Sequence, residues 1–230
     1  MRTNAPNQWR SSSFPDPRWT RIAATSRFVR TRSSPHDLVQ PKIVDAIDNG
    51  YLRIDPCPPL TAAEPPFNTS AIDLTLGDEI LVPDKGANIT FALKEQFSSR
   101  FLERNWRAVK IREDQPFKLE PNRLVLGRTA ESIEFPLSST GPNYCARVEG
   151  RSSNARLGLV VHLTAPTIHA NFKGTVTLEM VNFGVYPLEL TPGIKICQLV
   201  IETVDGVPTV VPSQFRGQSA PQGLTASSAP

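Results

Sequence analysis

Proline recurs along this 230-residue chain, which contains 22 prolines. Because proline breaks helices and cannot donate a hydrogen bond inside a sheet, this regular interruption favours short strands and turns over long helices. From residue 115 onward, short apolar or alternating runs are separated by turn residues, with no helical pattern between them. Such spacing is typical of an antiparallel sandwich or barrel, so the sequence predicts an all-β fold.

Seven segments in the C-terminal half have the pattern of strands bounded by turns. They are 117–127, 132–136, 143–149, 159–165, 174–182, 186–193 and 194–204.

The N-terminal half predicts one further strand and two helices. Pro41 suits the first turn of a helix, and Asn49 with Gly50 supplies its end. Residues 70–77 (SAIDLTLG) alternate as a strand with its apolar side chains on one face. A helical pattern is expected over 94–112, where the apolar residues are Phe97, Phe101, Leu102 and Trp106.

Composition divides the chain into three parts. Residues 1–36 contain seven arginines and one aspartate, a net charge of +6, which leaves −3 for the remainder. Three interpretations of residues 1–36 stay open: a disordered arm or over-long gene start, an organelle transit peptide, or a nucleic-acid-binding arm. A single domain is expected over 37–211, followed by a flexible tail over 212–230. We expect a cytoplasmic protein, unless residues 1–36 direct import.

Several classes of protein and site are disfavoured by the sequence. The cysteines (Cys57, Cys145 and Cys197) are scattered and the histidines lack the spacing of zinc hydrolases, so we expect neither a disulfide framework nor a zinc site. The acidic body argues against nucleic-acid binding. No apolar run approaches the roughly 20 residues of a membrane span.

Residues 150–158 (GRSSNARLG) place two arginines and two serines beside an apolar run. Ser152 or Ser153 can cap a short helix, whose N-terminus beside Arg151 suits a phosphate group. Ser152 and Arg156 are four residues apart and share one helix face. The alternative is a surface turn with capping serines and solvated arginines.

The segment 174–180 (GTVTLEM) predicts a strand with Thr175, Thr177 and Glu179 on the face opposite the core. A carboxylate on a rigid strand, shielded from water, is a suitable general base because desolvation raises its pKa. The alternative is an exposed or structurally paired glutamate. The turn before this strand carries His169, which is a surface residue or a site residue.

Together these segments resemble the dCTP deaminase family of the dUTPase-like superfamily. The family motif GRSSxARxGL matches Gly150 to Leu159, the family motif TAxxIDPGWxG corresponds to residues 164–174, and the following strand contains Glu179. The likeness extends over about residues 37–223, ending in SQFRGQSAPQG. It implies a homotrimer of distorted jelly-roll β-barrels with active sites between subunits.

The resemblance also implies roles for individual residues. Glu179 corresponds to the catalytic carboxylate, while Ser152, Arg156 and the backbone carbonyl of Ala165 correspond to groups that hold the attacking water. The remaining positions correspond to nucleotide contacts: Arg151, Ser153, Asn154, Ala155, His169, Thr177, Leu178, Gln214 and Gln218. The implied reaction converts dCTP to dUTP and ammonia without zinc, and the triphosphate arrives with Mg²⁺ held by phosphate oxygens and water.

Three positions depart from the family pattern. His169 stands where the family has Asp, Thr167 where it has Arg, and Gln214 where it has Lys. These changes affect sugar and phosphate contacts. Because an aspartate at the position of His169 is the base in dUTPases, dUTP hydrolysis is less expected here than deamination. The alternatives are a dUTPase, a bifunctional deaminase–dUTPase, and a nucleotide-binding homologue without turnover.

Overall fold

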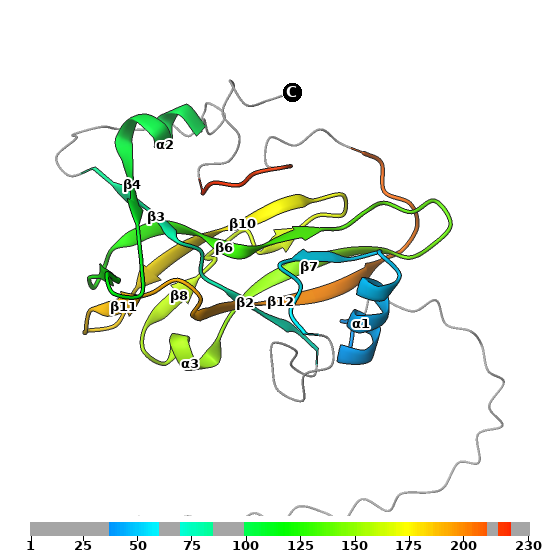
Figure 1. Ribbon diagram of the computed structural model, residues 1–230, viewed down its shortest axis with the longest axis horizontal. Helices are drawn as coiled ribbons and strands as arrows, with labels where there is room; N and C mark the ends of the chain where they lie inside the picture. Colours follow the sequence, from blue (N-terminus) through cyan, green and yellow to red (C-terminus); the bar gives the residue numbers. More distant parts are fainter. Residues whose placement is uncertain (1–36, 60–69, 85–98, 211–215, 222–230) are drawn as a thin grey trace, which may run out of the picture. The chain divides into compact units, whose positions relative to one another are not determined.

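The computed structural model of the chain describes residues 37–59, 70–84, 99–210 and 216–221 (Figure 1). These residues belong to one unit, Ser34–Pro230. The expectations for residues 1–36, Phe97 and Gln214 lie outside the described residues. Among the described helices, none combines the length and the apolar character that crossing a membrane requires.

The larger of two main sheets has the strand order β4-β3-β6-β10-β8, and β1 pairs with β6. Its strands are β1 (Arg53–Asp55), β3 (Glu79–Pro83), β4 (Trp106–Lys110), β6 (Leu124–Glu134), β8 (Leu159–Val161) and β10 (Lys173–Asn182). All its pairings are antiparallel.

The second main sheet has the order β2-β12-β7-β9, again with antiparallel pairing throughout. Its strands are β2 (Ile72–Thr75), β7 (Asn143–Gly150), β9 (Thr167–Ile168) and β12 (Lys195–Val204). A separate pair consists of β5 (Phe117–Leu119) and β11 (Leu188–Leu190). The all-β class is confirmed. In the part of the chain that the structure describes, the two main sheets are open and pack face to face, and no closed barrel is found among these strands.

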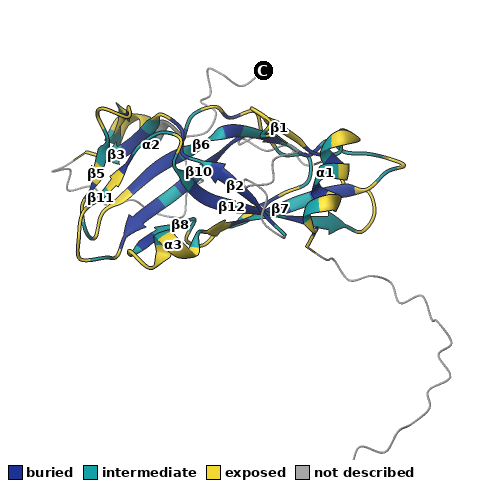
Figure 2. Cartoon of the chain, turned by 60° about the horizontal axis from the view of Figure 1, so that its bottom comes forward, coloured by how far each residue is buried: buried dark blue, intermediate teal, exposed yellow. Residues whose placement is uncertain are grey.

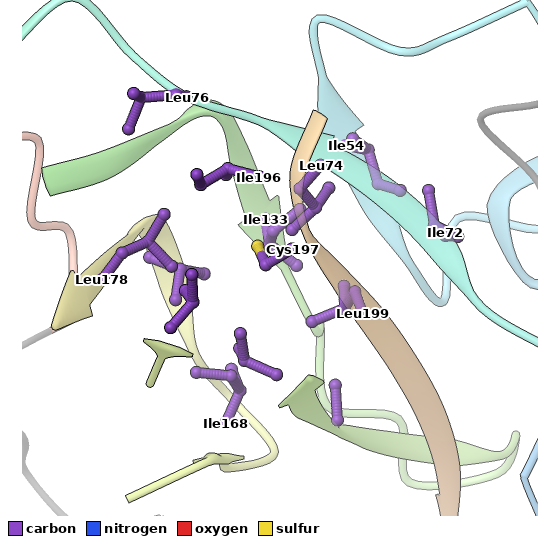
Figure 3. Packing of buried hydrophobic residues seen from close by; sticks show 14 of the residues in the cluster. Ile54, Ile72, Leu74, Leu76, Ile133, Ile168, Leu178, Ile196, Cys197 and Leu199 are labelled. Carbon is purple, nitrogen blue, oxygen red and sulfur yellow. The ribbon is translucent and has the colours of Figure 1, made fainter. Parts of the chain in front are cut away.

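One hydrophobic core joins the inner faces of the two main sheets. Its fully buried members include Ile133 and Leu178 from the larger sheet and Leu74, Ile196 and Leu199 from the smaller (Figure 3). Burying such a side chain contributes about 1.5–3 kcal/mol relative to leaving it exposed. Buried and partly buried residues alternate along much of β6 and β12 (Figure 2), as expected when one sheet face packs in the core more tightly than the other.

Helix α1 (Gln40–Asp48) forms where the sequence predicts it. Pro41 lies in its first turn, and Asn49 follows its last residue. Gly50 takes a φ of +71°, and its N–H donates to the Ile47 carbonyl oxygen at 2.9 Å. The helix therefore ends with a left-handed glycine, as its sequence indicates.

The expected helix over 94–112 is wrong in its second half. Helix α2 (Ser99–Asn105) ends before Trp106, where strand β4 begins and pairs with β3. The apolar spacing resembles a helix, but pairing with β3 determines the conformation from Trp106 onward. The expected strand over 159–165 is also shorter, since β8 ends at Val161 and His162 takes a left-handed φ of +64°.

Candidate active site

The segment that resembles a phosphate-binding motif forms a single helical turn, α3 (Ser152–Ala155). The expected capping by Ser152 or Ser153 is wrong, because the N-cap is Arg151 and makes no side-chain cap hydrogen bond. Ser152 is instead the first helical residue. Its carbonyl oxygen accepts from the Arg156 backbone N–H at 3.2 Å, which places both residues on one exposed turn.

Gly158 fixes the end of this segment. Its φ is +94°, and a Cβ atom there would overlap the backbone of Gly184, which follows strand β10. The Phe183 N–H also donates to the Gly158 carbonyl oxygen at 2.8 Å. Glycine at position 158 therefore lets the α3 segment lie directly against the chain that leaves β10.

The Arg151 side chain contacts a buried carboxylate. Its Nε atom lies 3.3 Å from Oδ1 of Asp73, whose side chain is only 1% exposed. The neighbouring Asn154 donates its side-chain amide to the Lys195 carbonyl oxygen at 3.2 Å, and Ser153 Oγ donates to the Asn154 side-chain oxygen at 3.4 Å. Ala155 is exposed. These contacts attach the turn to β2 and β12.

Strand β10 has the two faces that its alternation predicts. Val176, Leu178 and Met180 are 0–1% exposed and belong to the core. Thr177 and Glu179 lie on the opposite face and are half-buried. Leu178 pairs with Gly127 of β6, so the backbone of this part of β10 is anchored in the centre of the sheet.

Glu179 faces a histidine that the sequence reasoning did not select. Nδ1 of His162 lies 3.0 Å from Oε2 of Glu179, with the two side chains 6% and 36% exposed, respectively. The other ring nitrogen, Nε2, lies 2.8 Å from the Ala165 carbonyl oxygen. The His162 N–H also donates to the Glu179 carbonyl oxygen at 2.8 Å. The His162 imidazole thus contacts both the Glu179 carboxylate and the Ala165 carbonyl oxygen. The resemblance assigns that carbonyl oxygen to holding the attacking water.

The expected direction of the Glu179 pKa is wrong. Burial alone raises the pKa of this carboxyl, but hydrogen bonding and charge interaction with His162 outweigh burial and bring the pKa below its ordinary value. For His162, burial opposes the charged ring, yet the Glu179 carboxylate and the backbone carbonyls of Ala165 and Thr177 raise its pKa above the ordinary value. The pair therefore favours a carboxylate beside an imidazolium.

Residues 216–221 lie along the start of β10. The Gln218 carbonyl oxygen accepts from the Thr175 N–H at 3.0 Å, and the Gln218 side-chain amide donates to the Thr175 carbonyl oxygen at 2.8 Å. Thr177 Oγ1 donates to the Pro221 carbonyl oxygen at 3.1 Å. Gln218 is 5% exposed, and through Pro221 the segment contacts Thr177, which lies on the same strand face as Glu179.

The remaining candidates are dispersed. His169 is exposed, and its carbonyl oxygen accepts from the Phe172 N–H at 3.2 Å. Thr167 is also exposed and belongs to β9. Among the contacts of the described residues, no hydrogen bond or ion pair joins Glu179 to Ser152 or Arg156. Within one chain, the structure gives two half-sites: a carboxylate–histidine pair on β10 and β8, and a basic serine turn at α3.

The sequence indicates a role for His162 only through its place at the end of a strand. The residues on either side of it form no recognisable site motif. His162 directly follows the apolar run of β8, and antiparallel pairing of Val161 with Met180 brings the next residue beside Glu179. That neighbour relationship requires knowledge of which strands pair. The lack of zinc-ligand spacing around His162 gave no reason to consider it.

The fold and the candidate site together define a class of protein. It is an all-β protein with a half-buried carboxylate on a central strand and a turn that carries arginine and serine side chains. Residues 38–204 match the family model described as dCTP deaminase-like. The protein named dCTP deaminase, dUMP-forming, from Methanosphaera stadtmanae is 36% identical over 184 residues, which cover 76% of this chain and 86% of that protein. The chain therefore belongs to the dCTP deaminase-like family.

Two further comparisons agree with this membership. The dCTP deaminase of Rhodospirillum rubrum is 34% identical over 180 residues, covering 75% of this chain and 87% of that protein. The crystal structure of 2'-deoxycytidine 5'-triphosphate deaminase from Agrobacterium tumefaciens has a TM-score of 0.54 at 17% identity. That match covers 74% of this chain but only 48% of the solved chain, and it bears on the fold alone.

Proposed function

We propose that this chain catalyses the hydrolytic deamination of dCTP, in which dCTP and water give dUTP and ammonia. The observation that carries the proposal is the Glu179 carboxylate, fixed on a central strand and 3.0 Å from His162. Family membership and the activities named for the relatives support the same reaction.

The reaction requires a proton carrier at the cytosine ring. Water adds to C4, N3 gains a proton, and the amino group leaves as ammonia. Glu179 accepts one proton of the attacking water and passes it to N3. It then accepts the second proton from the new C4 hydroxyl and passes it to the amino group, so that C4 becomes a carbonyl and ammonia leaves. General acid–base catalysis of this kind contributes about 10²–10⁴-fold in rate, and alignment of water, carboxylate and ring contributes more.

His162 sets the basicity of that carboxylate. While the imidazole is charged, the pKa of Glu179 is held down, and the carboxylate is a weak acceptor for a proton from water. When the imidazole loses its proton, the carboxylate becomes more basic. His162 also interacts with the Thr177 backbone carbonyl, on the strand edge that the resemblance assigns to the base.

Arg151 and Ser153 are proposed to bind the phosphate groups, whereas Ser152, Arg156 and the Ala165 carbonyl oxygen are proposed to hold the attacking water. An arginine and a hydroxyl supply charge-assisted and neutral donors to phosphate oxygens. In the described part of the chain, no cluster of three or more His, Cys, Asp or Glu side chains is arranged to hold a metal ion. We accordingly propose that Mg²⁺ enters as part of the substrate, with phosphate oxygens and water as its ligands.

We infer that the complete site forms between copies of the chain in a homotrimer. In one chain the two half-sites make no described contact with each other. Beside α3, the structure exposes the large apolar side chains of Leu157, Phe183, Val185 and Tyr186, which are 62–79% exposed. Burial of such a group against a second copy favours association. Light scattering after size exclusion should give three times the chain mass of 25.3 kDa.

The decisive experiment incubates the purified protein with dCTP, dUTP and dCMP in Mg²⁺ and separates the products. Ammonia and dUTP from dCTP are expected. Pyrophosphate and dUMP instead would identify the dUMP-forming activity for which the Methanosphaera relative is named. Turnover of dUTP alone would identify a dUTPase. Binding of nucleotide with no product would show a homologue without turnover and refute the proposal.

The location of the protein stays a prediction. We propose a cytoplasmic enzyme, because dCTP is a soluble metabolite and the family model begins at residue 38, after the arginine-rich segment. A fusion of residues 1–36 to a fluorescent protein tests the alternative. Cytoplasmic fluorescence is expected, and organelle fluorescence would identify residues 1–36 as a transit peptide.

A further inference from the structure

Asp73 is a buried carboxylate that neither the sequence motifs nor the proposed reaction uses. It lies on β2 between Ile72 and Leu74, both of which are fully buried in the core (Figure 3). Strand alternation therefore turns Asp73 to the outer face of its sheet. An outward aspartate is ordinarily exposed, yet the Asp73 side chain is only 1% exposed.

Among the described residues, polar and cationic side chains from two other segments contact Asp73. Oδ1 accepts from Nε2 of Gln198 at 3.0 Å and lies 3.3 Å from Nε of Arg151. Oδ2 lies 3.4 Å from Nζ of Lys195. Arg151 and Lys195 are 28% and 37% exposed, so both cations reach from the carboxylate to solvent. One negative charge thus holds two positive charges together.

The Asp73 carboxylate and the two cations stabilise one another. A carboxylate removed from water is strongly disfavoured unless it is paired and hydrogen-bonded. Here Oδ1 accepts a hydrogen bond from Gln198, and each oxygen lies within ion-pair distance of a cation. Two cations beside each other also repel unless an anion lies between them. Asp73 meets both conditions, and it fixes the positions of two flexible side chains that would otherwise sample many rotamers.

The cluster lies directly beneath the turn assigned to phosphate binding. Arg151 immediately precedes Ser152, the first residue of α3. Lys195 is tied to the same turn, because its carbonyl oxygen accepts from the Asn154 side chain at 3.2 Å. Asp73 contacts Arg151 through Nε, and none of the described contacts uses the terminal guanidinium nitrogens. Those nitrogens are the donors suited to an oxygen of an anionic ligand.

We propose that Asp73 is a positioning residue that holds Arg151 and Lys195 as a cation pair for the phosphate groups of the nucleotide. This role rests on the proposed function, and it adds Lys195 as a second cation of the phosphate site. Asp73 itself does not touch the nucleotide. Its effect is on affinity for the triphosphate rather than on the chemical step at C4.

The test compares Asp73→Asn with the wild-type protein and with a matched control. Asn has nearly the same shape but no charge to hold the two cations. Glu131→Gln is the control, since Glu131 is also a buried carboxylate, 9% exposed, but its described partners are the backbone N–H and the hydroxyl of Thr75. Both variants remove a buried charge, but only Asp73→Asn removes one from the cation pair.

The measured quantities are KM and kcat for dCTP, the Kd for inorganic tripolyphosphate by calorimetry, and the thermal midpoint. For Asp73→Asn we expect KM and the tripolyphosphate Kd to rise about tenfold or more, with kcat within about threefold of wild type. Glu131→Gln should lower the midpoint without raising either constant. Asp73→Glu, which restores the charge, should recover part of the affinity.

Other outcomes separate this proposal from the proposed reaction. A lower midpoint in Asp73→Asn with unchanged KM and tripolyphosphate Kd would show a merely structural carboxylate and overturn the proposal. If wild-type protein released no ammonia but bound tripolyphosphate in an Asp73-dependent manner, the reaction would fail and the positioning role would stand. If Asp73→Asn did not fold, Lys195→Met must still raise the Kd, and an unchanged value would overturn the role of Lys195.

Discussion

Nδ1 of His162 lies 3.0 Å from Oε2 of Glu179, and its other ring nitrogen lies 2.8 Å from the carbonyl oxygen of Ala165. The histidine therefore links the carboxylate on β10 to the loop that follows β8. Because a charged imidazole lowers the basicity of its partner, this contact joins the protonation state of His162 to the strength of the proposed general base.

The first prediction concerns the pH dependence of activity. Wild-type kcat/KM for dCTP should rise as pH increases through the pKa of His162, which is raised above its ordinary value of 6.5. Loss of the imidazolium charge leaves Glu179 more basic. In His162→Gln, which does not titrate, this rise should be absent. Ammonia release measured from about pH 5 to pH 9 tests this. The same ascending limb in both proteins would rule out His162 as its origin.

The second prediction concerns stability. The pKa of His162 is raised, so its contribution is complete below 6.5 and is lost as pH rises through the folded-state pKa. The pKa of Glu179 is lowered, so its contribution is complete above 4.5 and is lost as pH falls through the folded-state pKa. The difference in thermal midpoint between wild type and His162→Gln should therefore be largest between pH 4.5 and 6.5. A difference independent of pH would contradict the ion pair.

The third prediction concerns the C-terminal segment. Gln218 is buried against Thr175 by both its backbone and its side chain. Gln218→Ala should raise KM for dCTP by about tenfold, as expected for loss of the nucleotide contact that the family resemblance implies, while the free energy of unfolding falls by about 1 kcal/mol. Steady-state kinetics and urea unfolding measure the two effects. Unchanged KM with lower stability would mean that the segment only packs on β10.

The fourth prediction concerns the junction of α3 with β10. Gly158→Ala should destabilise the fold by at least about 2 kcal/mol, because alanine is strained at a φ of +94° and its Cβ would overlap Gly184. Gly150→Ala is the control, since no atom lies within 4 Å of a Cβ there. Urea unfolding of both variants provides the comparison, and equal stabilities would contradict the close approach at Gly158.

The fold was predictable where local chemistry determines it. Pro41 and Gly50 set the limits of α1, and alternation along β10 correctly assigns Glu179 to the face opposite the core. Trp106 was assigned to a helix because its spacing from Phe101 and Leu102 fits one. In the structure it begins β4, whose partner strand lies more than 20 residues earlier in the chain. Local periodicity contains no information about such pairing.

The site was predictable only in part, for the same reason. Glu179, Arg151 and the serine turn could be selected from the motif, but their partners come from distant segments. His162 reaches Glu179 through the pairing of β8 with β10, and Asp73 reaches Arg151 from β2. The raised pKa expected for Glu179 was wrong because burial was considered without the histidine beside it.

Ammonia release from dCTP by Glu179→Gln tests the central claim most directly. Glutamine keeps the size and hydrogen-bonding capacity of the side chain but cannot accept the proton of the attacking water. The variant should retain the wild-type thermal midpoint to within a few degrees and bind dCTP, yet release ammonia at least about 10²-fold more slowly. Ammonia release at the wild-type rate from a folded Glu179→Gln protein would contradict the assignment of Glu179 as the base.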